Sequence, residues 1–484
     1  MKIDVPKEVV AVSYALAEAG FEAYLVGGCV RDMLLGREPK DWDVATDAQP
    51  AQVQKLFPES VYENDFGTVG IKTESEDPRL KIIEVTTYRI EGRYTDKRHP
   101  DEVKFAENIE DDLSRRDFTV NALAMDMKGD VIDPFGGERD IKDRVIRTVG
   151  VPEERFSEDA LRLMRAVRFS VELDFEIEMN TRRAIVKLAG GLEAIAKERV
   201  RDELVKILMT PNAAKGIILL EELDLLRYVL PELRDGIGVG QNKHHIYTVF
   251  EHNVRALDYT AGENYSLPVR MAALLHDVGK PKVKGGDGAN STFYQHEYVG
   301  ARMVVKMLDR LRFSKDFVEQ VAHLVRRHMF YYDTGVISPA GVRRLVVRVG
   351  PENIDDLLKV READRIGSGV KKAMPYRLRH LLFMIEKVKR DPLSPKMLAL
   401  RGDDLMPLLD LPQSRRVGWI LNALMEEVID DPEKNDKKYL EKRAKELNQE
   451  SDGELQELFA QAQKKKREAE EEMDNDIKEK HHIQ

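Results

Sequence analysis

The sequence predicts an α+β protein, with a mixed-sheet head in about its first 150 residues and a helical remainder. Stretches rich in β-branched residues and glycine turns occur before Gly150. From Ser157 onward, apolar residues recur every three or four positions, the spacing of one face of a helix. The chain has 484 residues, of which 42% are hydrophobic and 34% charged, so it can form more than one core under a solvated surface.

The elements of the head follow from local patterns taken in order. Apolar residues at helical spacing predict a first helix that ends at Gly20, and a glycine pair at Gly27 and Gly28 predicts a tight turn between a strand and a helix. A short polar turn at Lys128-Gly129-Asp130 predicts a hairpin. The expected helices are 6–19 and 29–35, and the expected strands are 21–26, 42–46, 66–71, 81–87, 124–126 and 131–133.

Strand patterns fade after Gly150, so we expect helices from there on, with a joint at the glycine-rich stretch 236–240. From about Asp430 the chain is dense in charge, and we expect a solvent-exposed helix that frays into a charged tail. The division that we expect is a head (1–150), a helical neck (151–240), a third domain (241–370) and a helical C-terminal region (371–484).

Charge and cysteine content exclude several classes of protein. There are 77 Lys and Arg against 87 Asp and Glu, a net charge of −10, so any nucleic-acid binding must be local. A single cysteine, Cys29, excludes an intramolecular disulfide and fits a reducing cytoplasm. No stretch approaches the roughly 18 apolar residues that a membrane span needs, so we expect no membrane partner.

Two carboxylates follow the first glycine turn. Asp41 and Asp43 are two residues apart, so on a strand both side chains point to one side of the sheet and can bind divalent cations together. Paired Mg²⁺ ions held in this way serve phosphoryl transfer. Gly27 and Gly28 let the backbone approach a phosphate, and the helix that starts there offers free amides to the anion. Alone, this pattern also fits a solvated turn.

Five motifs in a fixed order make the pattern specific. Over about residues 20–235, the chain resembles the class II tRNA nucleotidyltransferases of the polymerase beta superfamily, which include CCA-adding enzymes and bacterial poly(A) polymerases. The motifs are Leu25-Val-Gly-Gly-Cys-Val-Arg-Asp32, Lys40-Asp-Trp-Asp-Val-Ala45, Arg115-Arg-Asp-Phe-Thr-Val-Asn-Ala122, Asp133-Pro-Phe-Gly-Gly137 and Glu158-Asp-Ala-Leu-Arg162.

The resemblance implies roles for residues in and near these motifs. Glu84 would be the third catalytic carboxylate beside Asp41 and Asp43, although an outward-facing strand residue is an equal alternative. A set of polar residues would bind the phosphates and the ribose of the nucleotide. The alternative is that these residues cap helices and form structural ion pairs. That set is Arg31, Asp32, Arg115, Arg116, Asp117 and Asn121.

Asp159 and Arg162 lie three residues apart and are expected on one helix face, where they present an acceptor beside a fork of donors. Cytosine and adenine both place an exocyclic amine beside an unprotonated ring nitrogen, whereas guanine and uracil show the reverse arrangement. The resemblance therefore implies that this pair, helped by Arg165, accepts CTP and ATP. A helix-surface ion pair is the alternative.

Two further segments match the family. Residues 89–104 resemble its flexible loop, which is shorter in relatives that add only CC. The full length here favours an enzyme that adds A, and an A-only relative would keep the loop too. A mobile surface loop would be equally polar. The stretch from Glu198 to Glu203 resembles the neck motif, where we expect structural contacts rather than chemistry.

In the helical half, Ala272-Ala-Leu-Leu-His-Asp-Val-Gly-Lys280 carries adjacent histidine and aspartate. This segment and later histidine and aspartate residues follow one another in the order of the metal ligands of an HD-domain phosphohydrolase. Imidazole and carboxylate groups together suit Mn, Fe, Ni, Co or Mg. The resemblance implies phosphatase or 2′,3′-cyclic phosphodiesterase activity; an inert scaffold is the alternative. The expected ligands are His252, His276, Asp277, His296, His328 and Asp364. The pair His244-His245 is ambiguous.

The resemblance therefore predicts an enzyme that transfers CMP and AMP from CTP and ATP to the 3′ end of tRNA without a template, with Mg²⁺ on Asp41 and Asp43. An enzyme that adds only A and a poly(A) polymerase are the alternatives of the same chemistry. An RNA-binding metal phosphohydrolase with an inactive head is the alternative of another class. The sequence leaves the oligomeric state open.

Overall fold

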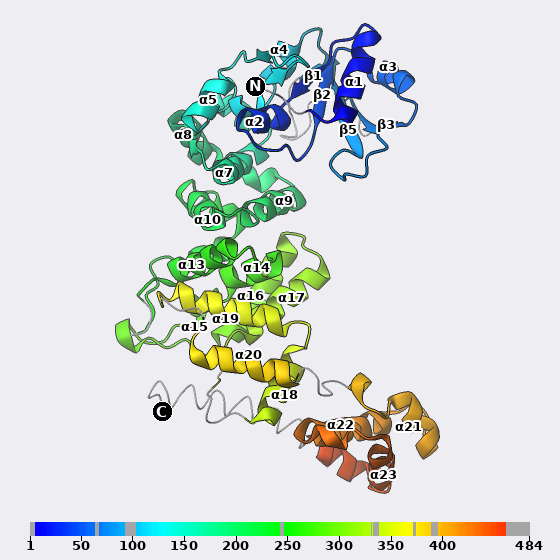
Figure 1. Cartoon of the computed structure of the whole chain (residues 1–484). Coiled ribbons are helices and arrows are strands. Elements are labelled where there is room, and N and C mark those ends of the chain that lie inside the picture. Colours follow the sequence, from blue (N-terminus) through cyan, green and yellow to red (C-terminus); the bar gives the residue numbers. More distant parts are fainter. Residues whose placement is uncertain are drawn as a thin grey trace. The chain divides into compact units, whose positions relative to one another are not determined.

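The computed structural model describes residues 5–62, 67–91, 103–242, 246–330, 332, 338–370, 374–388 and 395–460 (Figure 1). The chain divides into two compact units, one of Met1–Asp235 with Met307–Ser314 and one of Gly236–Lys306 with Lys315–Gln484. The division falls at the glycine-rich stretch where the sequence indicates a joint. Within the described residues, no helix is long and apolar enough to span a bilayer.

The head contains a mixed seven-stranded sheet in the order β3-β4-β5-β2-β1-β8-β9, which confirms the predicted fold class. Strand β2 lies between β1, which is antiparallel to it, and β5, which is parallel to it. The predicted hairpin is present as β8 and β9. The strands are β1 (Tyr24–Val26), β2 (Asp43–Thr46), β3 (Ser60–Tyr62), β4 (Thr68–Lys72), β5 (Ile82–Thr87), β8 (Ala124–Met125) and β9 (Val131–Ile132).

Two glycines of the head allow close contacts that a side chain would block. Gly27 has φ +75° between β1 and α2, and a Cβ there would lie 2.6 Å from Nη1 of Arg116. A Cβ on Gly137 would lie 2.2 Å from the carbonyl oxygen of Thr119, so α5 packs closely on η1. The elements are α1 (Lys7–Glu18), α2 (Gly28–Leu34), α3 (Pro50–Leu56), α4 (Ile109–Ser114), η1 (Thr119–Asn121) and α5 (Gly137–Asp143).

Five short strands depart from the prediction, and one of them is β3 of the main sheet. β6 (Arg89–Glu91) and β7 (Val103–Phe105) pair antiparallel at the two ends of the predicted loop, whose residues 92–102 lie outside the described part. β10 (Val145–Ile146) pairs parallel with β11 (Glu176–Ile177), so the expectation that strands stop at Gly150 was wrong. Two-residue strands are too short to show a period of two in the sequence.

The rest of the first unit is helical. Helix α7 is its centre, because it packs against both α9 and α10. The helices are α6 (Pro152–Glu158), α7 (Leu161–Leu173), α8 (Met179–Leu188), η2 (Ala189–Ala194), α9 (Lys197–Leu208), α10 (Ala213–Glu222), α11 (Leu226–Val229) and α12 (Pro231–Arg234).

In the second unit, α13 packs against both α14 and α19 (Figure 1). The approach of α19 is close, because a Cβ on Gly367 would lie 2.8 Å from the carbonyl oxygen of His252. His244 and His245 lie outside the described residues. The helices are α13 (Val249–Gly262), α14 (Leu267–Leu275), α15 (Lys280–Val283), η3 (Gly288–Asn290), α16 (His296–Arg310), α17 (Lys315–Arg327), α18 (Pro339–Val349), α19 (Ile354–Gly367) and α20 (Tyr376–Val388).

The C-terminal helices form a core of their own. Leu440, Ala444 and Leu447 of α23 are buried against α22, so the expectation of a solvated helix after Asp430 was wrong; its charged residues surround an apolar stripe. The charged tail at 461–484 lies outside the described residues. The elements are η4 (Pro395–Met397), α21 (Gly402–Leu409), α22 (Arg415–Asp430), η5 (Pro432–Lys434) and α23 (Lys437–Leu447).

Candidate functional site

Three carboxylates meet where β2 and β5 run side by side. In this parallel pair Asp43 is in register with Glu84, and Asp41 lies two residues before Asp43. Strand β2 begins at Asp43, so Asp41 precedes the strand rather than lying on it as predicted. Trp42 between them is buried, whereas Asp41 is exposed and Asp43 half-buried, which is the alternation expected for two acids on one side.

The electrostatics of these acids favour a cation. Burial and the charges of Asp41 and Glu84 together raise the pKa of Asp43 to about 7, against the opposing charge of Arg116. Three negative groups this close repel one another unless a positive charge lies among them. Their oxygen atoms suit Mg²⁺, and the crowding shows that the residues present fit such an ion.

A cavity of about 970 Å³ opens beside these acids. Asp41 and Asp43 line it, and so does every residue that the sequence predicts to bind nucleotide; Glu84 is not among its lining residues. The lining includes ten basic and six acidic side chains, so the cavity is locally positive although the chain is negative. This volume lies at the upper end of the range of about 300–1,000 Å³ typical of ligand sites. The predicted nucleotide-binding residues are Gly27, Gly28, Arg31, Asp32, Arg115, Arg116, Asp117, Asn121, Asp159, Arg162 and Arg165.

A hydrogen-bonded chain joins three elements across this cavity. Arg31 of α2 pairs with Asp32 at 2.8 Å and donates to Oδ1 of Asn121 at 2.6 Å. Nδ2 of Asn121 donates to Asp117 at 3.2 Å, and Asp117 accepts from Arg165 of α7 at 2.7 Å. Burial would raise the pKa of Asp117, but Arg165 and its other partners outweigh burial and hold that pKa at about 2. The cavity wall is therefore charged and fixed in place.

Arg115 and Arg116 lie in the turn directly after α4. The buried carboxylate of Asp112 orients both, because its oxygens accept from Arg115 at 2.7 Å and from Arg116 at 3.2 Å. Sequence reasoning did not identify Asp112. Its spacing of three and four residues from two arginines is the signal that would have indicated the contact.

Asp159 and Arg162 both line the cavity but do not share a helix. Asp159 is extended between α6 and α7, and its Oδ1 accepts from the backbone N–H of Leu161. The prediction of one helix face was therefore wrong, because an aspartate that bonds the first turn of a new helix ends the preceding one. Asp159 pairs with Arg199 of α9 at 2.8 Å, whereas Arg162 pairs with Glu158.

Helix α9 also supports the floor of the cavity. Glu203 is buried and pairs with Arg168 at 2.7 Å. The Arg168 guanidinium lies 4.0 Å from the centre of the Phe169 ring, and the guanidinium groups of Arg165 and Arg31 lie 5.2 and 5.5 Å from it. The neck segment thus makes structural contacts, as the sequence indicated. Phe169 is a lining residue that the sequence analysis missed, since an aromatic at helical spacing reads as core.

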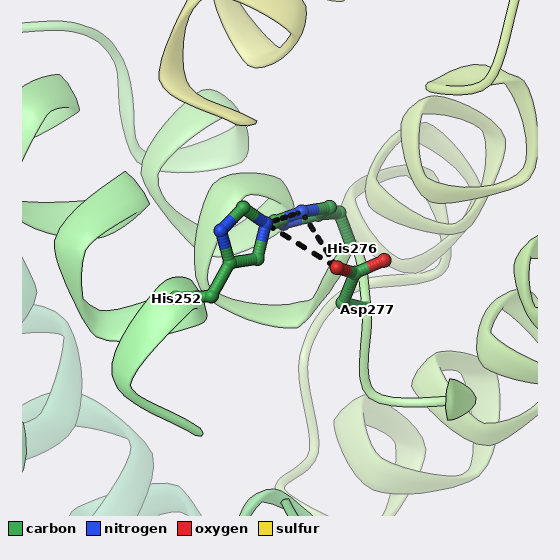
Figure 2. Close-up of side chains that lie close together, drawn as sticks. All are labelled: His252, His276 and Asp277. Carbon is green, nitrogen blue, oxygen red and sulfur yellow. Dashed lines mark hydrogen bonds and ion pairs between the residues drawn. The ribbon is translucent and has the colours of Figure 1, made fainter. Parts of the chain in front are cut away.

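The second unit brings together all the ligands predicted there, from five separate segments. Nε2 of His252 lies 2.9 Å from Nε2 of His276, and both lie 3.3 Å from Oδ2 of Asp277 (Figure 2). Oδ1 of Asp364 lies 3.3 Å from Nε2 of His252. The other oxygen of Asp277, Oδ1, lies 3.2 Å from Nε2 of His296 and 3.7 Å from Nε2 of His328.

Backbone hydrogen bonds orient three of these imidazoles. Nδ1 of His276, His296 and His328 each donates to a carbonyl oxygen three residues earlier, at 2.8, 2.8 and 2.7 Å. This bond holds a proton on Nδ1 and turns Nε2 toward the cluster. Burial opposes a charge on His276, but Asp277 and Asp364 outweigh burial and raise the pKa of His276 to about 10. Imidazole nitrogens and carboxylate oxygens that converge in this way fit a divalent cation, whose binding displaces protons from its ligands.

The charge balance of the cluster supports the same interpretation. Burial opposes ionisation of Asp277 and Asp364. Lys280 is the main group that nevertheless keeps the pKa of Asp277 well below the usual range, and Arg361 does the same for Asp364. Burial and the neighbouring imidazoles lower the pKa of His328, which stays neutral. Within the described residues, two groups of three residues have ligand atoms close enough together to hold one metal ion, and both groups lie in this cluster. One is His252, His276 and Asp277, and the other is Asp277, His296 and His328.

Lys280 is a further residue that sequence reasoning did not assign. Its ammonium lies 2.6 Å from Oδ2 of Asp277 and donates to Gln241 at 2.7 Å, and the side chain is buried. The spacing of three residues between Asp277 and Lys280 on one helical turn is the signal for this contact.

Family models match three parts of the chain. They are described as the poly A polymerase head domain at residues 23–147, a probable RNA and SrmB-binding site of polymerase A at 174–237, and an HD domain at 249–368. These matches confirm the resemblance that the motifs indicated.

Among known proteins, the chain is 37% identical over 417 residues to an A-adding tRNA nucleotidyltransferase of Deinococcus radiodurans, covering 84% of this chain and 91% of the relative. It is 46% identical over 223 residues to a CCA-adding enzyme of Ligilactobacillus salivarius, covering 46% of this chain and 54% of that enzyme. The chain thus spans about half the length of that CCA-adding relative.

Among solved structures, the chain resembles that of the Bacillus stearothermophilus CCA-adding enzyme in complex with CTP. The TM-score is 0.68 at 30% sequence identity, over 92% of this chain and 97% of that one. A Thermotoga maritima CCA-adding enzyme complexed with tRNA has a TM-score of 0.54 at 21% identity, which supports the fold alone.

Proposed function

Because this chain belongs to the class II tRNA nucleotidyltransferases, the family of CCA-adding enzymes and bacterial poly(A) polymerases, we propose that it completes the 3′ end of tRNA by adding CMP and AMP from CTP and ATP. The observation that carries this proposal is the single cavity that joins the acids Asp41 and Asp43 to the pair Asp159 and Arg162. The part of the cavity at Asp41 and Asp43 suits the reacting phosphate, and the part at Asp159 and Arg162 suits a base.

The residues of the chain have distinct tasks in this proposal. Mg²⁺ held by Asp41 and Asp43, with Glu84 beside them, would supply charge for the departing pyrophosphate and activate the attacking 3′ hydroxyl. Arg115 and Arg116 bind the triphosphate, and Asp117 with Asn121 fixes the wall next to the ribose. The carboxylate of Asp159 and the guanidinium of Arg162 read the edge of the base.

Incorporation assays test this proposal. Unmodified enzyme should add CMP and then AMP to tRNA that lacks CCA, whereas the Asp41→Asn/Asp43→Asn double variant should add neither while still binding tRNA. Asp47→Asn is a matched control, since Asp47 follows the same strand and does not line the cavity. Incorporation by the double variant at the unmodified rate would overturn the assignment.

A second outcome is favoured by one observation, the long match to an A-adding enzyme. An enzyme that adds only A would extend tRNA ending in CC and leave tRNA that lacks CCA unchanged. A poly(A) polymerase would give tails longer than one adenosine. CMP incorporation into tRNA that lacks CCA excludes both.

We propose metal-dependent phosphoester hydrolysis as a second function, carried by the histidine cluster of the second unit. The two ligand groups share Asp277, which presents one oxygen to each, so either group could hold a divalent ion such as Mn, Fe, Ni, Co or Mg. A metal there would activate water toward a phosphate ester, for example a 2′,3′-cyclic phosphate. Lys280 keeps Asp277 ionised.

Metal analysis of the purified chain tests this site. His276→Ala should lose bound transition metal and cyclic-phosphate hydrolysis together. His323→Ala is the matched control, because His323 lies on α17 and its Nε2 contacts the carbonyl of Val349 instead of the cluster. Absence of metal from the unmodified protein after purification without chelator would refute the proposal.

A further inference from the structure

The segment that carries Asp41 has no regular structure of its own. Residues 38–41 precede β2 and, in the part of the chain that the structure describes, make no backbone–backbone hydrogen bond. The Asp41 carboxylate likewise has neither a hydrogen bond nor an ion pair to a described residue. An acid that binds a cation has to be held in place by its surroundings, and here the neighbouring residues of the chain must do so.

The side chains beside Asp41 connect this segment to two supports. Trp42 is buried in the head, and Glu38 forms an ion pair within the head at 2.7 Å. Lys40 makes a different connection, because its Nζ lies 2.8 Å from Oε1 of Glu172 on α7. Lys40 and Glu172 are 132 positions apart, and both line the cavity. Their ion pair, which we call the clasp, therefore connects the segment of Asp41 to a helix of the cavity wall.

The Glu172 end of the clasp is fixed by other charged groups. Oε2 of Glu172 lies 3.4 Å from Nη1 of Arg168. Arg168 in turn pairs with the buried Glu203 of α9 at 2.7 Å and lies 4.0 Å from the centre of the Phe169 ring. The Glu172 side chain is 25% exposed, whereas that of Lys40 is 78% exposed. Lys40 is thus the partner that has to be ordered when the clasp forms, because Glu172 is already held in place.

The charge of Glu172 suits this role. Burial would raise the pKa of Glu172, but Lys40 and Arg168 outweigh burial and lower that pKa below its usual value. Glu172 is therefore an ionised anchor for the ammonium group. An exposed ion pair adds little to the stability of a fold, so the clasp affects the placement of one segment more than it affects folding.

We propose that Lys40 and Glu172 are positioning residues of the nucleotide-adding site, because the clasp holds the segment of Asp41 against α7 and so places this acid where it can share a divalent cation with Asp43. The inference rests on the proposed addition of nucleotides, in which these two acids hold Mg²⁺. Neither Lys40 nor Glu172 has to touch the substrate for this effect.

Kinetics of AMP addition to tRNA ending in CC test the clasp in the full chain. Lys40→Met and Glu172→Gln each keep the size of the side chain and remove its charge. Each should lower kcat about fivefold or more and change KM for ATP less than about twofold, because the acid is misplaced and base recognition is not. The double variant should be no slower than the slower single variant, since all three lose the same interaction. Lys187→Met is the matched control, because Lys187 is an exposed lysine of α8 that has a carboxylate at 3.6 Å and does not line the cavity.

A second measurement needs neither metal nor substrate. The chain has two tryptophans, so in a Trp419→Phe background the fluorescence reports Trp42, which follows Asp41 directly. In EDTA, Lys40→Met and Glu172→Gln should each raise the quenching of Trp42 by acrylamide roughly twofold, because the segment opens more often. Lys187→Met should leave quenching unchanged. Lys40→Arg can still pair with the carboxylate of Glu172 and should restore both quenching and kcat. Urea unfolding of each variant checks that the head is folded.

The results separate the clasp from direct substrate binding. If Lys40→Met raises KM for ATP while Glu172→Gln behaves like the unmodified chain, Lys40 contacts the nucleotide and the inference is overturned. Unchanged kcat in folded Lys40→Met and Glu172→Gln would overturn it as well. If the unmodified chain adds no nucleotide, the proposed function is refuted, and the quenching of Trp42 alone then decides whether the clasp holds the segment.

Discussion

Asp112 offers the sharpest test of how the head is held together. Its side chain is fully buried, and it accepts from two arginines that each keep about one sixth of their side-chain exposure, 16% for Arg115 and 17% for Arg116. Burial would raise the pKa of Asp112, but the two guanidinium groups lower it below its usual value. Asp112→Asn keeps the shape of the side chain and removes its charge.

The expected cost follows from these contacts. Breaking a buried ion pair by removing one partner costs about 3–5 kcal/mol, because the remaining charge is left uncompensated. Since both arginines retain some contact with water, we expect a value at the lower end, about 3 kcal/mol. With a urea dependence of about 3 kcal/mol per molar, the unfolding midpoint of the head should fall by about 1 M.

The assay uses the two tryptophans of the chain, Trp42 in the head and Trp419 in α22. In a Trp419→Phe background, fluorescence reports the head alone. Asp111→Asn is the matched control, because it removes the same charge from the same turn of α4. Among the described residues, no ion pair involves the Asp111 side chain. A midpoint for Asp112→Asn equal to that of Asp111→Asn would refute the reasoning. We also expect a raised KM for nucleotide, since both arginines line the cavity.

Three further outcomes are expected. Burial raises the pKa of the Cys29 thiol to about 12, so in native protein at pH 8 it should not react with a thiol reagent, and it should react fully in urea. Gly137→Ala should reduce kcat for nucleotide addition at least tenfold, measured by incorporation, because its Cβ would meet the Thr119 carbonyl at 2.2 Å and displace η1; an unchanged kcat would contradict the close contact. The pKa of Asp117 is about 2 in the folded chain against about 3.9 unfolded, so its pair with Arg165 contributes stability that is present above about pH 4 and is lost as pH falls through 2. Urea unfolding at pH 5 and pH 2.5 should show this loss as about 2 kcal/mol, and Asp117→Asn should lack it.

Much of the fold was predictable because its signals are local. The turn at Gly27 and Gly28, the strand that follows it and the hairpin near Gly129 depend on residues a few positions apart. The acids Asp41 and Asp43 were placed together because one residue separates them. The histidine cluster was predictable in membership from motif order, although its members come from distant segments.

The errors arose where tertiary contacts decide. Asp159 ends one helix and bonds the start of the next, so its spacing from Arg162 did not place the two on one face. The spacing of Asp112 from Arg115 and Arg116 indicates a contact, but only the fold shows that this acid is buried beneath both arginines. Leu440 is surrounded by charge in the sequence, and although Ala444 and Leu447 follow it at helical spacing, only the fold supplies α22 as the partner that buries this stripe.

The position of α7 has a consequence for any attempt to isolate the polymerising portion. This helix lies between the segments that the two N-terminal family models match, yet it provides Arg162, Arg165, Arg168 and Phe169. A fragment truncated near residue 150 would keep the acids Asp41 and Asp43 and lose half of the residues that line the cavity. The minimal autonomous catalyst must therefore extend through Leu208, so that Arg199 and Glu203 accompany the groups they brace.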